Sequence, residues 1–172
     1  MQQRLVRFSL LLATALLLSA CGFQLRGTGD VAVSDEWRSM YLVTNNPNSE
    51  FSREVKARFA ANGVEWKDDK KAANYAVVLG PERFSQRNLS LNSEARAAEF
   101  ELTMRSTFSV NDGAGGQVME ATTSSVVKQM ENDPRNVVGK AEEIRILKAE
   151  MRGELAQQIL RRIAFFAAAQ EA

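Results

Sequence analysis

Histidine is absent from this chain of 172 residues, and cysteine occurs only once, at Cys21. Histidine is the usual general base near neutral pH and the commonest zinc ligand, so the usual histidine-dependent enzymes are excluded. A single cysteine excludes an intramolecular disulfide and a cysteine-rich metal site. The glycines at 113–116 lack the lysine of a phosphate-binding loop and indicate a hairpin tip. We therefore expect no catalytic residues, no metal and no cofactor, although acidic residues are numerous enough to leave paired-carboxylate chemistry open.

The chain also lacks an excess of charge of either sign, because its formal net charge is only +1. Arg4 and Arg7 precede Cys21 with no acid among them, so acidic and basic residues nearly balance in the remainder. Binding to a nucleic-acid backbone needs a surplus of lysine and arginine on one face, so the composition argues against nucleic acid as a partner. The length suits one domain with one core.

Residues 1–20 have the three parts of an export signal. Arg4 and Arg7 stand near the start, an apolar run extends from Phe8 to Leu18, and the small residues 19–20 follow. The apolar run is too short to span a bilayer comfortably. We predict that 1–20 is a signal peptide.

The small residues lead directly into Cys21, and the sequence Leu-Ser-Ala-Cys at 18–21 resembles the bacterial lipobox. In such proteins the cysteine is lipidated and becomes the first residue of the mature chain. One acyl chain holds a protein only marginally, whereas two or more anchor it stably, and this resemblance implies three. Gly22 rather than aspartate follows, which favours the outer membrane. The alternative is a chance cysteine or a small buried core residue.

The first part of the mature chain contains several β-rich runs. Residues 21–36 are expected to form an extended lead, and 39–44 a strand. Residues 64–67 form a short strand or an extended segment. Residues 74–79 are predicted to form a strand, and the pattern of the sequence allows this strand to continue through Phe84 to Leu91.

A helix is predicted between the first two of these runs. Ser49 follows an Asn/Pro-rich turn and is the candidate N-cap. Phe51, Val55 and Phe59 recur at spacings of four and give the helix one apolar stripe. The Asn-Gly pair at 62–63 is typical of a helix C-terminus.

The second half alternates strictly before it becomes helical. Residues 98–108 alternate between an apolar and a polar face, 111–116 form a hairpin turn, and 117–129 return as a strand. From about 141 to 169 the helical period returns. Its apolar stripe consists of Ile144, Leu147, Met151, Leu155, Ile159, Ile163 and Phe166. This order predicts an α+β fold, a two-layer sandwich with two helices on one face of a small mixed four-stranded sheet.

Several of these segments are similar to one known family. They are the Cys-Gly-Phe-Gln-Leu-Arg-Gly run at 21–27, Leu42 before the Asn/Pro turn, the helix at 51–65, the Ala-Glu-Phe strand start at 98–100, and Asn-Asp-Pro at 132–134 ahead of Lys140. On these residues the chain resembles the LptE family of lipopolysaccharide-assembly lipoproteins, over essentially the whole mature sequence, 21–172.

The resemblance implies a protein that is not an enzyme but a partner of the large outer-membrane barrel LptD. Such a protein sits largely inside the barrel as a plug, helps the barrel to assemble, and binds lipopolysaccharide. It would be lipid-anchored through Cys21, at the periplasmic face of the outer membrane and in the barrel lumen. A nearly uncharged, polar-surfaced domain agrees with a position in a wet lumen.

Two basic residues are candidates for contact with lipopolysaccharide, whose phosphates need cationic partners. Lys140, six residues after Pro134, matches a family lysine implicated in ligand contact. The family's companion arginine falls on Ser93 here, and Arg96 is shifted from that position by three residues. A solvated surface residue is the alternative for Lys140 and the favoured interpretation for Arg96.

Two other functions remain open from the sequence. A lipid-anchored periplasmic hydrolase would need two carboxyl groups roughly 5 to 9.5 Å apart in a groove. A lipoprotein that binds a small apolar ligand would need an internal cavity instead of a dense core.

Overall fold

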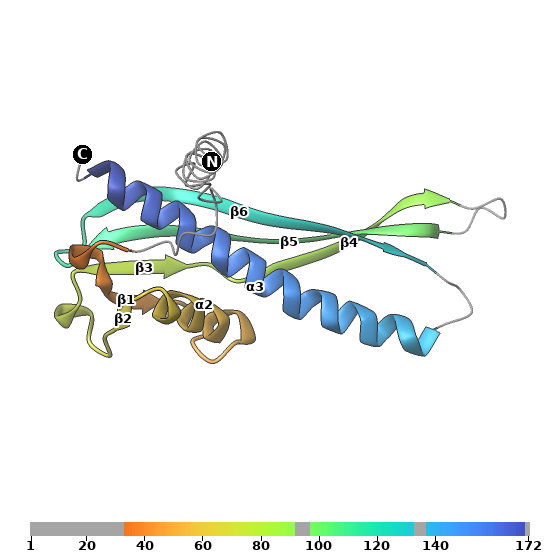
Figure 1. The fold of residues 1–172 in the computed structure, drawn as a ribbon, viewed down its shortest axis with the longest axis horizontal. Coiled ribbons are helices and arrows are strands. Elements are labelled where there is room, and N and C mark those ends of the chain that lie inside the picture. Colours follow the sequence, from red (N-terminus) through yellow and green to blue (C-terminus); the bar gives the residue numbers. More distant parts are fainter. Residues whose placement is uncertain (1–32, 92–96, 133–136, 171–172) are drawn as a thin grey trace, which may run out of the picture. The chain divides into compact units, whose positions relative to one another are not determined.

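The computed structural model describes residues 33–91, 97–132 and 137–170, which belong to a single unit (Figure 1). The predicted signal peptide, Cys21, Ser93 and Arg96 lie outside the described residues. Val33, in the segment expected to be an extended lead, is buried with 1% of its surface exposed. The elements in chain order are η1 (Asp35–Arg38), β1 (Ser39–Val43), α2 (Glu50–Ala61), β2 (Glu65–Trp66), η2 (Lys70–Ala72), β3 (Tyr75–Leu79), β4 (Arg83–Leu91), β5 (Ala97–Asp112), β6 (Gln117–Glu131) and α3 (Val137–Gln170).

The predicted α+β class is confirmed, and the sheet is mixed. Strand β1 pairs in parallel with β2 and β3, whereas β3, β4 and β6 all pair antiparallel with β5. The sheet has six strands rather than the expected four. Two features account for the difference: the two-residue strand β2 pairs with β1, and the long run from Tyr75 to Leu91 is interrupted in the middle.

The interruption lies between β3 and β4, which continue along the same edge of β5. Leu79 pairs with Phe108 and Arg83 with Arg105, while β6 pairs with the other edge of β5. The Gly80 amide donates to the Thr107 carbonyl at 2.8 Å, and a Cβ on Gly80 would lie 2.9 Å from that oxygen. Pro81 has no amide hydrogen to donate to the ladder. The predicted continuation to Leu91 is therefore confirmed, with a local break at 80–82.

The structure confirms the limits and the apolar stripe predicted for the first helix. The Ser49 hydroxyl accepts a hydrogen bond from the Ser52 amide at 3.0 Å, which caps the N-terminus of α2. The three aromatic and aliphatic side chains of the stripe are buried. They are Phe51, Val55 and Phe59. The chain leaves the helix through Gly63, whose φ of +90° is strained for residues with a side chain.

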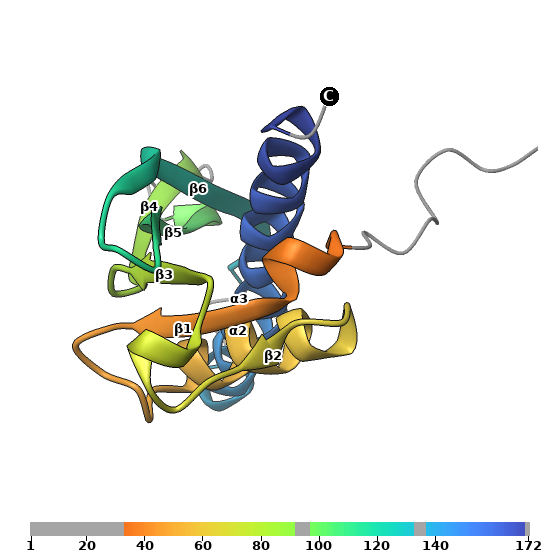
Figure 2. The ribbon, with the colours of Figure 1, turned by 90° about the vertical axis from the view of Figure 1, so that its left-hand side faces the viewer.

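Helix α3 lies along the long strands β5 and β6, and with α2 it covers one face of the sheet (Figures 1 and 2). It begins at Val137, earlier than the predicted start near 141. Its predicted stripe packs on the core, with Met151, Leu155, Ile159 and Ile163 fully buried. The alternation predicted for β5 is also confirmed, because Leu102, Met104, Ser106 and Phe108 are buried between the layers.

Candidate functional site

Lys140 lies near the start of α3, over one end of the sheet. Its Nζ atom is 5.2 Å from the centroid of the Phe100 ring on β5. Phe100 points toward the helix layer and packs against the core, in register with Asn88 on β4 and Met130 on β6. An ammonium over an aromatic face is held by the ring quadrupole, without any loss of its charge. Lys140 is thus a positioned, half-buried lysine at the end of the core.

No ion pair involves Lys140 within the part of the chain that the structure describes. Its ammonium therefore retains donors for an external anion. Arg96, the second candidate, and Ser93 lie outside the described residues, so the structure locates only Lys140 of the predicted pair.

A second lysine repeats this arrangement two helical turns further along α3. The Nζ atom of Lys148 lies 4.2 Å from the centroid of the Phe84 ring on β4. Neither Lys148 nor the two aromatic partners, Phe84 and Phe100, are predicted as site residues from the sequence. The available signal was the spacing: Lys140, Ile144 and Lys148 lie four residues apart, so they share the face of the helix that packs on the sheet.

Two further cations in this layer are neutralised by acids. Lys128 on β6 pairs with Glu150 at 2.9 Å and Glu154 at 2.7 Å, and the hydrogen bond that its ammonium donates to Glu154 is the main cause that raises the pKa of Lys128. Arg152 binds Glu82 through three hydrogen bonds and also pairs with Glu50. The Glu82 hydrogen bonds are the main cause that raises the pKa of Arg152. These pairs link α3 to the sheet and to α2, whereas Lys140 and Lys148 form no ion pair with any residue in the described ranges.

Among the described residues, no helix covers the opposite face of the sheet (Figure 2). The side chains on this face are mainly polar. By register, the side chains on it are Arg83, Ser85 and Arg87 on β4, Glu101, Thr103, Arg105 and Thr107 on β5, and Thr123, Ser125, Val127 and Gln129 on β6. Val127 is the most apolar of these, with 55% of its surface exposed. This face is wet, as the alternation of β5 predicted.

Strand β6 forms one border of the sheet, because it pairs only with β5 among the described strands. A border strand of 15 residues presents backbone groups that a strand of another chain can pair with. Helix α3 covers part of it, since Arg162 donates to the Thr123 carbonyl at 2.9 Å. The border is a candidate surface for a protein partner.

The described residues contain no group of three or more histidine, cysteine, aspartate or glutamate side chains that could hold a metal ion. Among these same residues, no helix is long and apolar enough to cross a membrane.

Comparison with known proteins gives the family. A model of the LptE lipopolysaccharide-assembly family matches residues 37–163, which include every strand and most of α3. The chain belongs to the LptE family. The resemblance stated from the sequence is therefore confirmed.

The relatives of this LptE family member agree with that assignment. The LPS-assembly lipoproteins LptE of Yersinia pestis and Yersinia pseudotuberculosis are each 28% identical over 158 residues, which cover 90% of this chain and 74% of theirs. The solved structure of rare lipoprotein B from Shewanella oneidensis has a TM-score of 0.68 at 26% identity, covering 77% of this chain and 98% of that one. A lipoprotein B from Nitrosomonas europaea has a TM-score of 0.71 at 20% identity, covering 86% and 94%, and supports the fold.

Proposed function

We propose that this LptE family member is a non-enzymatic outer-membrane lipoprotein that acts in lipopolysaccharide assembly by fitting against an LptD-type barrel and binding lipopolysaccharide. The match of the family model to residues 37–163 carries this proposal. The relatives that are LPS-assembly lipoproteins extend the match over 90% of the chain.

The anchor in this proposal is Cys21, freed by removal of 1–20 and carrying fatty acyl chains. An intact-mass measurement of the protein purified from membranes should show the mass of 21–172 plus the acyl groups. A Cys21→Ser variant should lack them and leave the membrane fraction. A wild-type protein that retains 1–20, or that carries no acyl group, contradicts this part of the proposal.

The domain has the surfaces that a barrel partner requires. A plug must be rigid and must have a polar exterior where it meets a wet lumen. Here a dense two-layer core is combined with a helix-free polar sheet face and with the open border of β6. Depletion of the protein is expected to leave a misassembled barrel and less lipopolysaccharide at the cell surface. Normal levels of both after depletion would overturn the proposal.

The site proposed for lipopolysaccharide contact is Lys140. Lipopolysaccharide combines phosphates with acyl chains, and Lys140 places an unneutralised ammonium beside the exposed part of Phe100. Lys140→Glu is expected to weaken lipopolysaccharide binding about tenfold or more, since one charge-assisted hydrogen bond contributes roughly 1.5–3 kcal/mol. Association with the barrel should persist.

The matched control is Lys71→Glu, which makes the same charge change at an exposed lysine of η2. Binding can be measured with purified protein and lipopolysaccharide in detergent. Equal effects of the two substitutions, or none from Lys140→Glu, would make Lys140 an ordinary surface residue.

Three carboxyls and three pockets among the described residues bear on the two alternative functions. A general acid in a carboxylate pair needs a raised pKa, but hydrogen bonds from Lys67, Arg87 and Arg145 lower the pKa values of their carboxyl partners. Those carboxyls are Glu65, Glu101 and Glu142. An apolar-ligand site would need an apolar cavity, whereas three pockets among the described residues are lined mainly by polar and charged side chains.

A further inference from the structure

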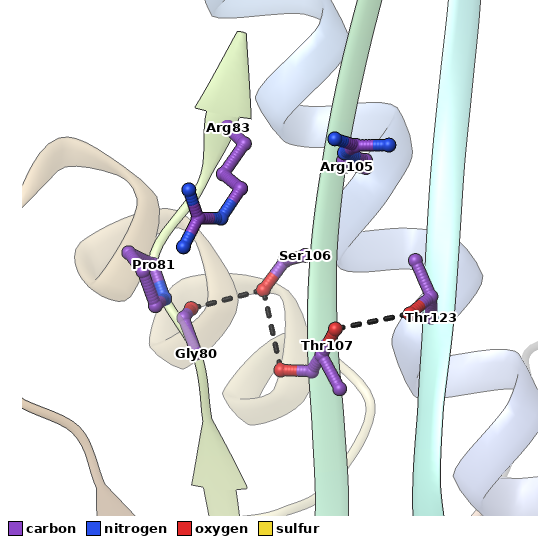
Figure 3. A pocket seen from close by; sticks show the side chains of 7 residues that line it. All are labelled: Gly80, Pro81, Arg83, Arg105, Ser106, Thr107 and Thr123. Atoms are coloured by element: carbon purple, nitrogen blue, oxygen red, sulfur yellow. Dashed lines mark hydrogen bonds between the residues drawn. The ribbon is translucent and has the colours of Figure 1, made fainter.

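A shallow pocket of about 370 Å³ opens on the helix-free face of the sheet, where β3 gives way to β4 (Figure 3). The helices lie behind the sheet in this view. The pocket is lined by Gly80, Pro81, Arg83, Arg105, Ser106, Thr107 and Thr123. The break at 80–82 creates the opening, because the strand backbone leaves the ladder there.

Two arginines stand directly opposite each other in this pocket. Arg83 and Arg105 are register partners on β4 and β5, and like charges in such positions repel. No acid lines the pocket, and neither arginine forms an ion pair with a residue that the structure describes. The repulsion is therefore left uncompensated within the described part of the chain.

Further along the same two strands, an arginine is paired with a carboxylate. Arg87 stands opposite Glu101, and the guanidinium donates two hydrogen bonds to the carboxylate, at 2.6 and 2.9 Å. This carboxylate is the closest one by register on that face, and it is already engaged. Arg83 and Arg105 thus differ from Arg87 in having no counter-ion among the residues that the structure describes.

Two hydroxyls complete the lining. The Oγ1 atoms of Thr107 and Thr123 lie 3.0 Å apart and share one hydrogen bond, which leaves the second hydroxyl hydrogen free to donate. The pocket is therefore lined by two arginines, whose guanidinium groups extend in different directions in Figure 3, and by one hydroxyl donor, with no carboxylate among its lining residues. This donor set selects an anion.

We propose that Arg83 and Arg105 form a binding site for a phosphate monoester or inorganic phosphate. A phosphate monoester carries close to two negative charges at neutral pH, which matches two guanidinium groups, whereas a carboxylate carries one. Arginine forks bind phosphate oxygens in pairs, and a threonine hydroxyl can donate to a third oxygen. The ligand is either free phosphate or the phosphorylated headgroup of a lipid.

This site is separate from the one proposed at Lys140. Arg105 and Phe100 are five positions apart on β5, roughly 17 Å at the usual rise of a strand, and they point to opposite faces of the sheet. The inference therefore does not depend on lipopolysaccharide contact at Lys140, and each can fail without the other.

The test is a binding titration with the full chain purified in detergent, at constant ionic strength. The probes are inorganic phosphate, dihexanoyl phosphatidic acid, and dihexanoyl phosphatidylcholine as the lipid without a phosphomonoester. Arg83→Gln and Arg105→Gln are each expected to weaken binding tenfold or more, while Arg105→Lys retains part of it. Arg161→Gln removes an exposed arginine of α3 outside the pocket and should leave the binding of every probe unchanged.

The outcomes separate the sources of the ligand. Arginine-dependent binding of inorganic phosphate supports a site for free phosphate, and arginine-dependent binding of phosphatidic acid alone supports a lipid headgroup. Thermal unfolding gives a second measurement, because phosphate should raise the melting temperature of the wild type more than that of Arg105→Gln. Acetate, which carries a single negative charge, is titrated as a further control. Acetate bound as tightly as phosphate, equal binding by wild type and both glutamine variants, or no binding of any probe would overturn the proposal.

Discussion

Two serines that face each other inside the sheet should respond in opposite ways to the same substitution. Ser106 and Ser124 are register partners on β5 and β6, and 2% and 0% of their surfaces are exposed. The Ser106 hydroxyl donates to the Gly80 carbonyl at 2.9 Å, and this bond holds the segment between β3 and β4 against β5. The Ser124 hydroxyl is buried without a hydrogen-bond partner among the described residues.

The magnitudes follow from this difference. Ser106→Ala removes the hydrogen bond to the Gly80 carbonyl and a longer one, 3.4 Å, to the Thr107 carbonyl, which share one hydroxyl hydrogen, and should lower the free energy of unfolding by about 1 kcal/mol. Ser124→Ala removes a hydroxyl whose unsatisfied burial costs roughly 1–3 kcal/mol, less a small loss of packing, so the free energy of unfolding should rise by about 1 kcal/mol. In a domain of this size, 1 kcal/mol corresponds to roughly 2–4 °C in melting temperature.

Urea denaturation of both variants at one pH checks the contrast, because the slopes should agree and the midpoints should move in opposite directions. The variant that carries both Ser106→Ala and Ser124→Ala should have a urea midpoint close to that of the wild type. If Ser124→Ala destabilises the protein as much as Ser106→Ala does, then Ser124 has a partner and the argument about this pair is wrong.

Three further predictions concern the contacts of α3 and the open sheet face. Arg152→Met should lower the free energy of unfolding, measured by urea denaturation, by about 2 kcal/mol, because the Glu82 side chain, only 27% exposed, loses its three hydrogen bonds. An unchanged free energy of unfolding would show that the Arg152–Glu82 pair does not stabilise the fold. Gly153→Ala should raise the free energy of unfolding by up to about 1 kcal/mol through helix propensity, because the atom that a Cβ would crowd, at 3.0 Å, is the movable end of the Arg58 side chain on α2. A lower urea midpoint than that of the wild type would mean that Arg58 cannot move. The hydrogen bond from Arg87 lowers the pKa of Glu101, so this pair stabilises the fold above pH 4.5, and the stabilisation is lost as the pH falls through the lowered pKa. Arg87→Gln should therefore lower the free energy of unfolding at neutral pH but not in acid. An equal loss of stability in acid would contradict the cause given for the pKa shift.

Much of the fold could be predicted because its signals are local. Ser49 and the spacing of Phe51, Val55 and Phe59 define α2 within a dozen residues. The alternation of β5 distinguishes its buried face from its wet face in the same way. The predicted start of α3 lies four residues too late, because Val137 and Gly139 have low helix propensity and give no local signal of a helix.

The remaining features depend on pairing between distant residues. Counting the strands required knowing that β2 pairs with β1 and that the chain leaves the ladder at 80–82. The ring beneath Lys140 comes from a residue forty positions earlier, and the opposition of Arg83 and Arg105 exists only in the observed register. The sequence indicated Lys140 as a candidate site residue, but it could not show that Phe100 lies beneath it.

The central claim is that this lipoprotein acts by fitting against a larger outer-membrane partner. The most direct measurement is affinity purification of the full chain from solubilised outer membrane, with mass spectrometry of the proteins and lipids that accompany it. The account predicts an acylated amino terminus at Cys21 and an LptD-type barrel in an amount comparable to the protein itself. A protein that is recovered alone, or without acyl groups from the soluble periplasmic fraction, would contradict it.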